Sequence, residues 1–235
     1  RSITASALDM IAADSTLVNR KSTVVFNPDW HKGVIGIVAS RLTETYYRPT
    51  IVLTENEGKV TGSARSVKHF DLYEAIFECR DLLIQFGGHK FAAGLTMLPE
   101  NVVAFREKFD AIVSERITEE QLVPELEIDA ELELGDITPN FFRILQQMAP
   151  FGPENMRPVF VTHQVKDTGW SKIVKEEHIK FSVKKNAPTV LDGIGFKLAF
   201  KMHLVKSDSF DIAYQIDENE WNGNVRLQML VKDIL

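Results

Sequence analysis

The fold class is decided by residues 22–54, STVVFNPDWHKGVIGIVASRLTETYYRPTIVLT. The β-branched, apolar run at residues 22–26 is typical of a strand. Apolar residues then recur at the three- and four-residue spacing of a helix, at Val34, Ile37, Val38 and Leu42. Pro49 ends this helical pattern, and residues 50–54 form a second buried strand. A strand, a helix and a strand in this order predict an α/β domain.

Strands and helices continue to alternate downstream. The sequence predicts a strand at residues 59–63, a helix at 72–86, a glycine turn at 87–88, a strand at about 92–98 and a helix from Pro99 to about Ile117. Apolar residues at helical spacing within residues 3–11 predict another helix, and the chain begins at Arg1 inside this pattern. We therefore expect a piece of a longer protein.

The character of the sequence changes near residue 120. Residues 119–136 contain eight acidic residues, no basic residue and Pro124, which together mark a domain boundary. Beyond it the sequence predicts a helix at 139–148 and short strands at 159–165, 173–174, 178–183, 193–196, 210–216 and 225–231. This pattern indicates a small antiparallel barrel. We expect an α/β domain at residues 19–120 and a barrel domain at 121–235.

Composition excludes several classes of protein. The chain has 235 residues, of which 44% are hydrophobic and 26% charged, values of a folded globular protein. Its single cysteine, Cys79, rules out a disulfide scaffold and lies at helical spacing from apolar neighbours, which indicates a buried core residue. No apolar run approaches the roughly 20 residues needed to span a bilayer, and residues 1–18 lack a signal-peptide pattern. We expect a cytoplasmic protein.

The net charge of −6 conceals a basic segment. Between Arg157 and Lys206 there are ten basic and four acidic residues, a local balance of +6. A solvated strand surface and a groove that tracks a phosphate backbone both fit this segment.

Residues 30–36, WHKGVIG, follow a predicted strand and open a predicted helix. Gly33 and Gly36 let the backbone approach a ligand at the helix N-terminus, where free N–H groups and the helix dipole favour an anion. A tight turn capped by His31 fits the same residues.

Residues 62–66, GSARS, place the hydroxyls of Ser63 and Ser66 around Arg65. A guanidinium binds two phosphate oxygens while hydroxyls and turn amides bind others. A surface turn with a solvated arginine is the alternative.

Residues 87–94, GGHKFAAG, are the most unusual stretch. Two glycines before His89 and Lys90, with small residues after them, indicate backbone held against another surface while two donors project from it. An imidazole there would stabilise charge on a phosphoryl oxygen. The alternative is a helix-ending turn with an exposed histidine.

Patterns of other sites are missing from the sequence. Its six histidines show none of the three- or four-residue spacings of helical metal ligands, so we expect no complete metal site. No Walker loop, dinucleotide fingerprint or serine nucleophile elbow occurs.

The three glycine-marked segments, in this order and spacing, resemble the C-terminal half of the RecJ family of single-stranded-DNA-specific exonucleases, within the DHH phosphoesterase superfamily. WHKGVIGIVASRL (30–42), GSARS and GGHKFAAG are similar to the signature segments of the DHH-associated domain. Three later segments resemble the OB-type domain that follows the DHH-associated domain in this family. They are APFGPENMRPVF (149–160), EEHIKF (176–181) and NGNVRLQMLVKDI (222–234).

The resemblance implies an α/β DHH-associated domain followed by an all-β OB-like barrel, with residues 1–18 as the end of a connector helix. It implies a 5′→3′ exonuclease dependent on Mn²⁺ or Mg²⁺, whose metal ligands lie in an N-terminal DHH domain outside this chain. The fragment alone is then expected to bind no metal and to be inactive. The implied partners are single-stranded DNA, the DHH domain in cis and DNA-repair proteins, with no membrane.

The resemblance also assigns site residues. His89 is the implied catalytic residue, and the implied substrate-binding residues are His31, Gly33, Ser63, Arg65, Ser66, Gly87, Gly88 and Lys90. Among these, Ser63, Arg65 and Ser66 are similar to the family's segment that binds the 5′-terminal phosphate.

For the barrel, the residue types themselves favour a basic groove with aromatic platforms. The candidates that would track a nucleic-acid backbone are Lys172, Lys175, Lys180, Lys184 and Lys185. Trp170, Phe181 and Trp221 are either stacking platforms or core residues. Strand alternation places Lys180 and Phe181 on opposite faces, so both cannot line one groove.

Two other functions stay open. The chain fits a binding or scaffold module without catalysis, and it fits a phosphodiesterase relative acting on oligoribonucleotides or dinucleotides with the same glycine–histidine turn. The barrel after residue 130 favours long polymers.

Overall fold

The computed structural model describes residues 2–152, 154–186, 189–221 and 223–235. The chain forms two compact units, Arg1–Glu125 and Leu126–Leu235. Each unit has its own hydrophobic core and is described by itself.

The first unit is built on a five-stranded sheet in the order β1-β2-β3-β5-β4. Its strands are β1 (Thr23–Phe26), β2 (Thr50–Asn56), β3 (Lys59–Arg65), β4 (Leu83–His89) and β5 (Ala92–Met97). β1 and β2 pair in parallel, and the remaining neighbours pair antiparallel. The parallel pair is joined through helix α3 (Ile35–Tyr46), because parallel neighbours need a crossover connection.

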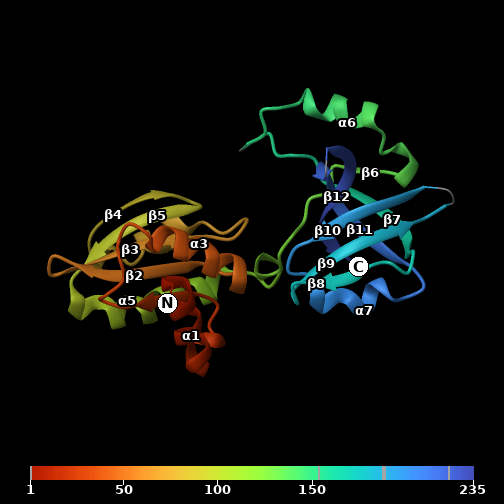
Figure 1. Ribbon diagram of the computed structural model, residues 1–235. Coiled ribbons are helices and arrows are strands. Elements are labelled where there is room, and N and C mark those ends of the chain that lie inside the picture. Colours follow the sequence, from red (N-terminus) through yellow and green to blue (C-terminus); the bar gives the residue numbers. More distant parts are fainter. Residues whose placement is uncertain (1, 153, 187–188, 222) are drawn as a thin grey trace. The chain divides into compact units, whose positions relative to one another are not determined.

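Helices cover the two faces of this sheet to different extents (Figure 1). α3 packs on the face that carries Val25 and Val52. α4 (Leu72–Phe77) and α5 (Val102–Arg116) contribute to the core on the opposite face, which carries Val24 and Ile51. The face under α3 stays partly exposed on β3, β5 and β4, whereas the opposite face of β3 and β5 is buried. This open area of the sheet is where the candidate site lies.

The helix expected at residues 72–86 is wrong in its second half. α4 ends at Phe77, the short helix η1 spans Arg80–Leu82, and β4 then begins. Gly87 and Gly88 therefore lie inside an edge strand rather than in a turn, and the reversal falls at Lys90–Phe91. Pairing of β4 with β5 over most of its length outweighs the local helical spacing of Leu82, Leu83 and Phe86.

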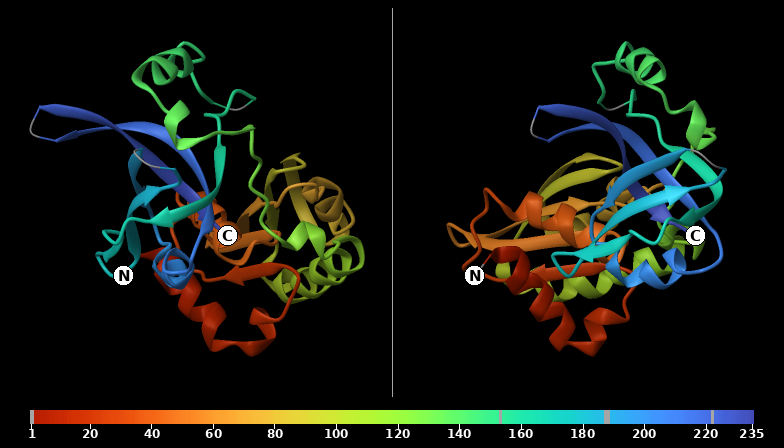
Figure 2. Two further views of the ribbon diagram at one scale, coloured as in Figure 1. Left: turned by 90° about the vertical axis from the view of Figure 1, so that its right-hand side faces the viewer. Right: turned by 45° about the vertical axis from the view of Figure 1, so that its right-hand side comes forward.

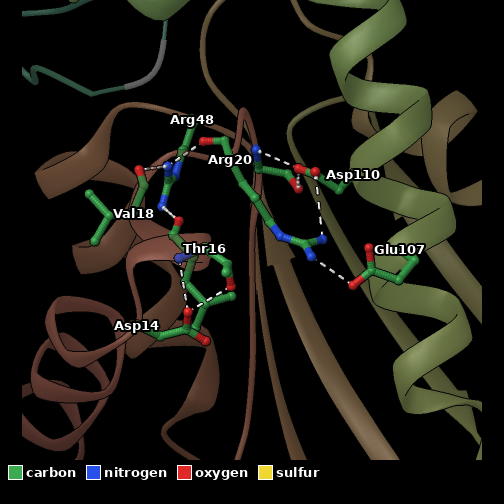
Figure 3. A network of polar contacts seen from close by, with 9 residues as sticks. Asp14, Thr16, Val18, Arg20, Arg48, Glu107 and Asp110 are labelled. Atoms are coloured by element: carbon green, nitrogen blue, oxygen red, sulfur yellow. Dashed lines mark hydrogen bonds and ion pairs between the residues drawn. The ribbon is translucent and has the colours of Figure 1, made fainter.

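The N-terminal helix is interrupted at Asp14. α1 (Ile3–Ala13) ends there, and the Asp14 carboxylate accepts hydrogen bonds from the backbone N–H and the hydroxyl of Thr16 at 2.9 and 2.6 Å, which starts α2 (Ser15–Val18). The buried Arg48 guanidinium then donates to the carbonyls of Leu17 and Val18, each at 2.8 Å (Figure 3). Because helix carbonyls at a C-terminus lack partners, this arginine fixes α2 to the sheet.

The second unit is a barrel-like sheet in the order β6-β7-β11-β12-β10-β9-β8, with an additional β7–β9 pairing. Its strands are β6 (Ala130–Glu131), β7 (Phe160–Asp167), β8 (Lys172–Val174), β9 (His178–Lys184), β10 (Val190–Gly195), β11 (Phe210–Trp221) and β12 (Asn224–Ile234). The β7–β9 contact spans two residue pairs, so the barrel is partly open there. β10 and β12 pair in parallel, which an antiparallel barrel did not predict. β11 and β12 form a long hairpin (Figure 2).

The expected fold class, an α/β domain followed by an OB-like barrel, is confirmed. The described part of the second unit also contains α6 (Pro139–Gln146) and α7 (Met202–Val205). The remaining short helices are η2 (Pro99–Asn101), η3 (Glu120–Leu122), η4 (Leu134–Asp136) and η5 (Ala199–Lys201). Strand alternation fills the barrel core with residues such as Ile179, Phe181 and Tyr214.

Candidate nucleic-acid interface

Arg65 and His89 lie in one row of the first unit's sheet. Arg65 on β3 pairs with Ala92 on β5, and His89 on β4 pairs with the same Ala92. Directly paired residues project from the same face of a sheet, so both side chains belong to the open face. Two strand spacings of about 4.8 Å separate their backbones by about 10 Å.

Arg65 is held beside Ser63 and the start of α3. Its Nη1 donates to the Ser63 hydroxyl oxygen at 3.2 Å and to the Ala64 carbonyl at 2.8 Å. A Cβ placed on Gly36 would lie 3.2 Å from both Arg65 Nη2 and Ser63 Oγ. Any side chain at position 36 would therefore press on this pair, and glycine leaves room for it.

The N-terminus of α3 adds backbone donors to the same place. Its N-cap, Val34, makes no side-chain capping hydrogen bond. The first N–H groups of a helix have no intrahelical partner, and the helix dipole places partial positive charge there. Arg65, Ser63 and the amides of Ile35 and Gly36 thus form an arrangement suited to a phosphate; we call Arg65, Ser63 and the α3 N-terminus the anion cradle.

His31 and Gly33 shape the loop that leads into α3. The backbone N–H of Gly33 donates to Nδ1 of His31 at 3.1 Å. A Cβ on Gly33 would lie 3.0 Å from Cε1 of this ring, so the glycine lets the loop close over the imidazole. His31 is exposed, and its Nε2 is the ring nitrogen that remains for a ligand.

His89 and Lys90 project from the end of the edge strand. The backbone N–H of Phe91 donates to Nδ1 of His89 at 3.3 Å, which leaves Nε2 as the outer nitrogen of an exposed ring. Nζ of Lys90 lies 5.0 Å from the centroid of the Phe91 ring. Both side chains are exposed and accessible to a ligand on the open face or at its edge.

Ser66 has a structural role in the local turn. Its hydroxyl donates to the Phe70 carbonyl at 2.9 Å, and its backbone N–H donates to the Phe91 carbonyl at 3.0 Å. The Ser66 hydroxyl thus donates its proton within the protein, whereas the Ser63 hydroxyl oxygen accepts a hydrogen bond from Arg65.

In the second unit, three of the five predicted lysines share one face. Lys172 pairs with Lys180 across β8 and β9, and Lys184 lies four residues farther along β9 on the same exposed side. Lys166 pairs with Lys184 across β7 and β9 and extends this face. We call Lys166, Lys172, Lys180 and Lys184 the lysine face. Lys175 instead lies in the β8–β9 turn with a positive φ of 49°, so it does not belong to the row.

Other cations of the basic segment are neutralised. Lys185, Lys201 and Lys206 each lie 2.5 Å from a carboxylate, of Glu133, Asp233 and Asp167 respectively. The pKa of Asp167 is raised by burial, but hydrogen bonds from Lys206 and Ser171 outweigh burial and lower it overall. The exposed charge that the segment presents on one face is therefore that of the lysine face, whereas these three cations have structural partners.

A groove of about 610 Å³ lies beside Lys180 on the outer face of β9, β10, β11 and β12. Its polar lining includes Lys180, Asp192, Asn219, Arg226 and Gln228. Asn219 pairs with Arg226 across the β11–β12 hairpin. Sequence reasoning missed Arg226 because it lies outside the basic segment; the alternation of β12, which places it opposite the core side, was the available signal.

The aromatic candidates separate by burial. Phe181 is fully buried in the barrel core, so a stacking role for it is wrong. Trp170 is 81% exposed, so it does not contribute to the core. The side chain of Trp221 lies outside what the structure describes.

The described residues contain neither a metal-binding cluster nor a membrane-spanning helix. Within residues 2–152, 154–186, 189–221 and 223–235, no three His, Cys, Asp or Glu side chains cluster in a way that suits a metal ion. Across the same ranges, no helix has the length and apolar character needed to cross a membrane.

Comparison with protein families matches both units. The model of the DHHA1 domain matches residues 19–115, and the model of the RecJ OB domain matches residues 128–233. The chain belongs to the RecJ family. The expected resemblance is thus confirmed, since a DHHA1 domain is followed by a RecJ OB domain in one chain.

Curated RecJ proteins match over nearly the whole chain. The single-stranded-DNA-specific exonuclease RecJ of Bacillus subtilis is 34% identical over 98% of this chain, and RecJ of Escherichia coli is 30% identical over 89% of it. The chain spans only 30% and 37% of these relatives. It therefore corresponds to about a third of a RecJ protein.

The fold agrees with solved RecJ structures. RecJ of Thermus thermophilus in complex with Mn²⁺ superimposes with a TM-score of 0.81 at 27% identity, covering 99% of this chain and 33% of that one. The complex of the same protein with Mg²⁺ gives a TM-score of 0.80 and covers 98% of this chain and 35% of that one.

Proposed function

We propose that this chain binds the 5′ end of single-stranded DNA for a RecJ-type 5′→3′ exonuclease. The observation that carries the proposal is the shared row of Arg65 and His89 beside the uncapped N-terminus of α3. Three separate sequence segments thereby contribute to one face, although each alone fits an ordinary turn. The RecJ relatives, named as single-stranded-DNA-specific exonucleases, support the choice of substrate. A DNA substrate would also make the protein cytoplasmic.

In this proposal the anion cradle binds the terminal phosphate. Arg65 and the α3 amides supply charge and fixed N–H donors, and Ser63 orients the guanidinium. His31 and Lys90 would contact the same strand end. Gly33 lets its loop close over His31, Gly88 lets β4 approach β5 closely, and Gly87 leaves space for a ligand. Ser66 keeps the turn after Arg65 in place.

His89 is the proposed catalytic residue. Its Nδ1 is occupied by the N–H of Phe91, so Nε2 is positioned to donate to a phosphoryl oxygen. A donor that meets developing negative charge stabilises the transition state of phosphodiester hydrolysis.

Hydrolysis would also depend on Mn²⁺ or Mg²⁺, the ions present in the T. thermophilus RecJ structures. A divalent ion at such a site activates water and polarises the phosphoryl oxygen. The described residues of this chain do not fit such a centre, because no three ligand-type side chains cluster among them. The proposal therefore assigns the metal ligands to the DHH domain of a longer RecJ protein.

In this proposal the barrel would bind the part of the DNA strand that follows the 5′-terminal nucleotide. The lysine face and Arg226 offer charges for backbone phosphates, and Trp170 offers an exposed ring for a base. DNA-repair proteins are proposed as further partners of the longer protein.

Binding of labelled single strands tests the proposal. The affinity should fall steeply with salt, because phosphate contacts release counterions. Arg65→Ala should weaken binding of a 5′-phosphorylated strand by about tenfold or more and of a 5′-hydroxyl strand much less. Arg41→Ala, which removes an exposed arginine of the same α3, is the matched control and should leave both unchanged. Equal losses on both strands with Arg65→Ala would contradict a terminal-phosphate site.

A cleavage assay tests whether this chain binds DNA without cutting it, while the DHH domain supplies the metal ligands. With Mn²⁺ and a 5′-labelled single strand, full-length B. subtilis RecJ should release nucleotides, whereas this chain should release none. Cleavage by this chain would reveal a metal site within it and overturn the assignment of the ligands to another domain.

A further inference from the structure

A hollow of about 400 Å³ lies on the first unit's sheet, next to the anion cradle. It is lined by Thr61, Gly62, Gln85, Phe86, Gly87, Gly94, Leu95 and Thr96. Its volume falls within the range of about 300–1,000 Å³ that is usual for small-molecule sites. Of its lining residues, the function proposed above uses Gly87 alone.

The floor of this hollow is bare backbone. Across all five strands, one row runs Val25, Val52, Ser63, Gly94, Gly87. The two valines pack beneath α3. Farther along the row, where the helix no longer covers the sheet, the residues are a serine and then two glycines, which have no side chain. A Cβ on Gly87 would meet no atom within 4 Å, and one on Gly94 would meet only the Gly62 carbonyl oxygen, at 3.9 Å.

These two glycines are not required by the protein's own packing or backbone. Neither has a φ in the left-handed region, and both have space for a methyl group. Alanine is normally better than glycine in a strand, because glycine loses more conformational entropy on folding. The space above Gly87 and Gly94 is therefore available to something other than this chain's own atoms.

The side chains around the floor are neutral hydrogen-bonding groups. The hydroxyl oxygens of Thr61 and Thr96 lie 3.5 Å apart, and Gln85 pairs with Thr96 from the neighbouring strand. No lining residue of the hollow carries a charge. This chemistry suits a sugar or a base rather than a second phosphate, whose charge would lack a partner there.

We propose that the hollow is a nucleoside subsite, which receives the sugar and base of the nucleotide whose 5′-phosphate lies in the anion cradle. The inference rests on the proposed function. Ser63 links the two places, since it contacts Arg65 in the cradle and pairs with Gly94 on the floor. The row of Ser63 lies two residues from the row of Arg65, about 7 Å along the strand, so the phosphate and sugar of one nucleotide occupy neighbouring rows.

The subsite recognises the presence of a nucleoside, with little preference among bases. A flat glycine floor accepts the face of any base or sugar, and the Gln85 amide and both hydroxyls donate and accept hydrogen bonds. Removal of the terminal base should therefore cost affinity, whereas exchange of one base for another should cost little.

The test compares two 5′-phosphorylated single strands that differ only in whether the terminal nucleotide carries a base or is abasic. The chain as given should bind the abasic end about tenfold more weakly. The double variant Gly87→Ala with Gly94→Ala should lose about tenfold affinity for the normal end and little for the abasic end. Gly152→Ala, another glycine with nothing within 4 Å of an added Cβ, is the matched control in the second unit and should change neither.

A second pair of variants removes hydroxyls without changing shape. Thr61→Val with Thr96→Val should weaken binding of the normal end severalfold, and Thr45→Val, which removes an exposed hydroxyl on α3, should not. Equal affinity of the unmodified chain for both ends, or equal losses on both ends in the glycine variant, would overturn the subsite. If 5′-phosphate discrimination itself is absent, the proposed function fails; if it is retained while the base makes no difference, the subsite alone fails.

Discussion

Gly88 lies so close to Ala93 that a Cβ on Gly88 would come within 2.6 Å of the Cα of Ala93. The same Cβ would lie 2.3 Å from the Ala92 carbonyl oxygen, and Gly88 has a φ of 148°. Both neighbours are backbone of the paired strand β5, which cannot yield as a flexible side chain would. Its neighbour Gly87 has none of these constraints. The two adjacent glycines therefore have different physical reasons to be glycine.

We expect Gly88→Ala to destabilise the first unit by about 1–3 kcal/mol, the usual cost of overpacking. Gly87→Ala should stay within about 0.5 kcal/mol of the unmodified chain. Urea unfolding measures both, and the chain with Gly88→Ala should also bind a 5′-phosphorylated strand more weakly because His89 follows directly. Equal stability of the two variants would show that β4 relaxes away from β5 without cost.

Arg48 provides a second stability prediction. Its guanidinium is buried and donates to Thr23 Oγ1 at 2.7 Å, to two carbonyls at the end of α2 and to the Arg20 carbonyl just after it, and burial lowers its pKa. Arg48→Met leaves these carbonyls without donors, so we expect a loss of about 2–4 kcal/mol in the free energy of unfolding. Arg41→Met changes an exposed arginine and should cost less than about 0.5 kcal/mol. A small effect of Arg48→Met would mean that water replaces the lost donors.

Cys79 should be inert in the folded protein. It is fully buried, and this burial raises the pKa of its thiol to about 11. Since the thiolate is the reactive form, a thiol reagent at about pH 8 should modify the folded chain slowly and the urea-unfolded chain rapidly and stoichiometrically. Fast modification under native conditions would show that the segment after α4 opens readily.

Local patterns in the sequence predicted much of the fold. The order of β1, α3 and β2 follows from Ser22–Thr54, because both periodicities there are clear and each element is bounded by a turn residue. In β9, simple alternation correctly separated exposed Lys180 from buried Phe181. The OB-like character of the second unit followed from short strands and from the resemblance.

Pairing between distant strands could not be predicted in the same way. The run after Cys79 satisfies helical spacing, and only its partner β5 makes it a strand. The shared row of Arg65 and His89 depends on register across three strands, which no single segment contains. Ion pairs such as Lys206 with Asp167, which join residues 39 positions apart, likewise appear only after folding.

His163 gives the fold a pH-dependent contact that can be tested. Its Nδ1 lies 2.7 Å from Asp211 and its Nε2 lies 3.9 Å from Glu131. The hydrogen bond with Asp211 is the largest cause and raises the pKa of His163 overall, although burial and nearby Lys185 act to lower it. The stabilisation from charged His163 is therefore fully present below its unfolded pKa of about 6.5 and is lost as pH rises through the higher folded value. For Asp211, burial raises the pKa, but hydrogen bonds from Gln164 and His163 lower it overall, so its contribution is lost only as pH falls through that depressed value.

We expect His163→Gln to reduce the free energy of unfolding more at pH 5.5 than at pH 8.5. His203→Gln is the control, since Nδ1 of His203 contacts the Phe200 carbonyl rather than a carboxylate, and its effect should be the same at both values. A loss with His163→Gln that does not change between these two pH values would show that the imidazole acts there only as a neutral hydrogen-bonding group.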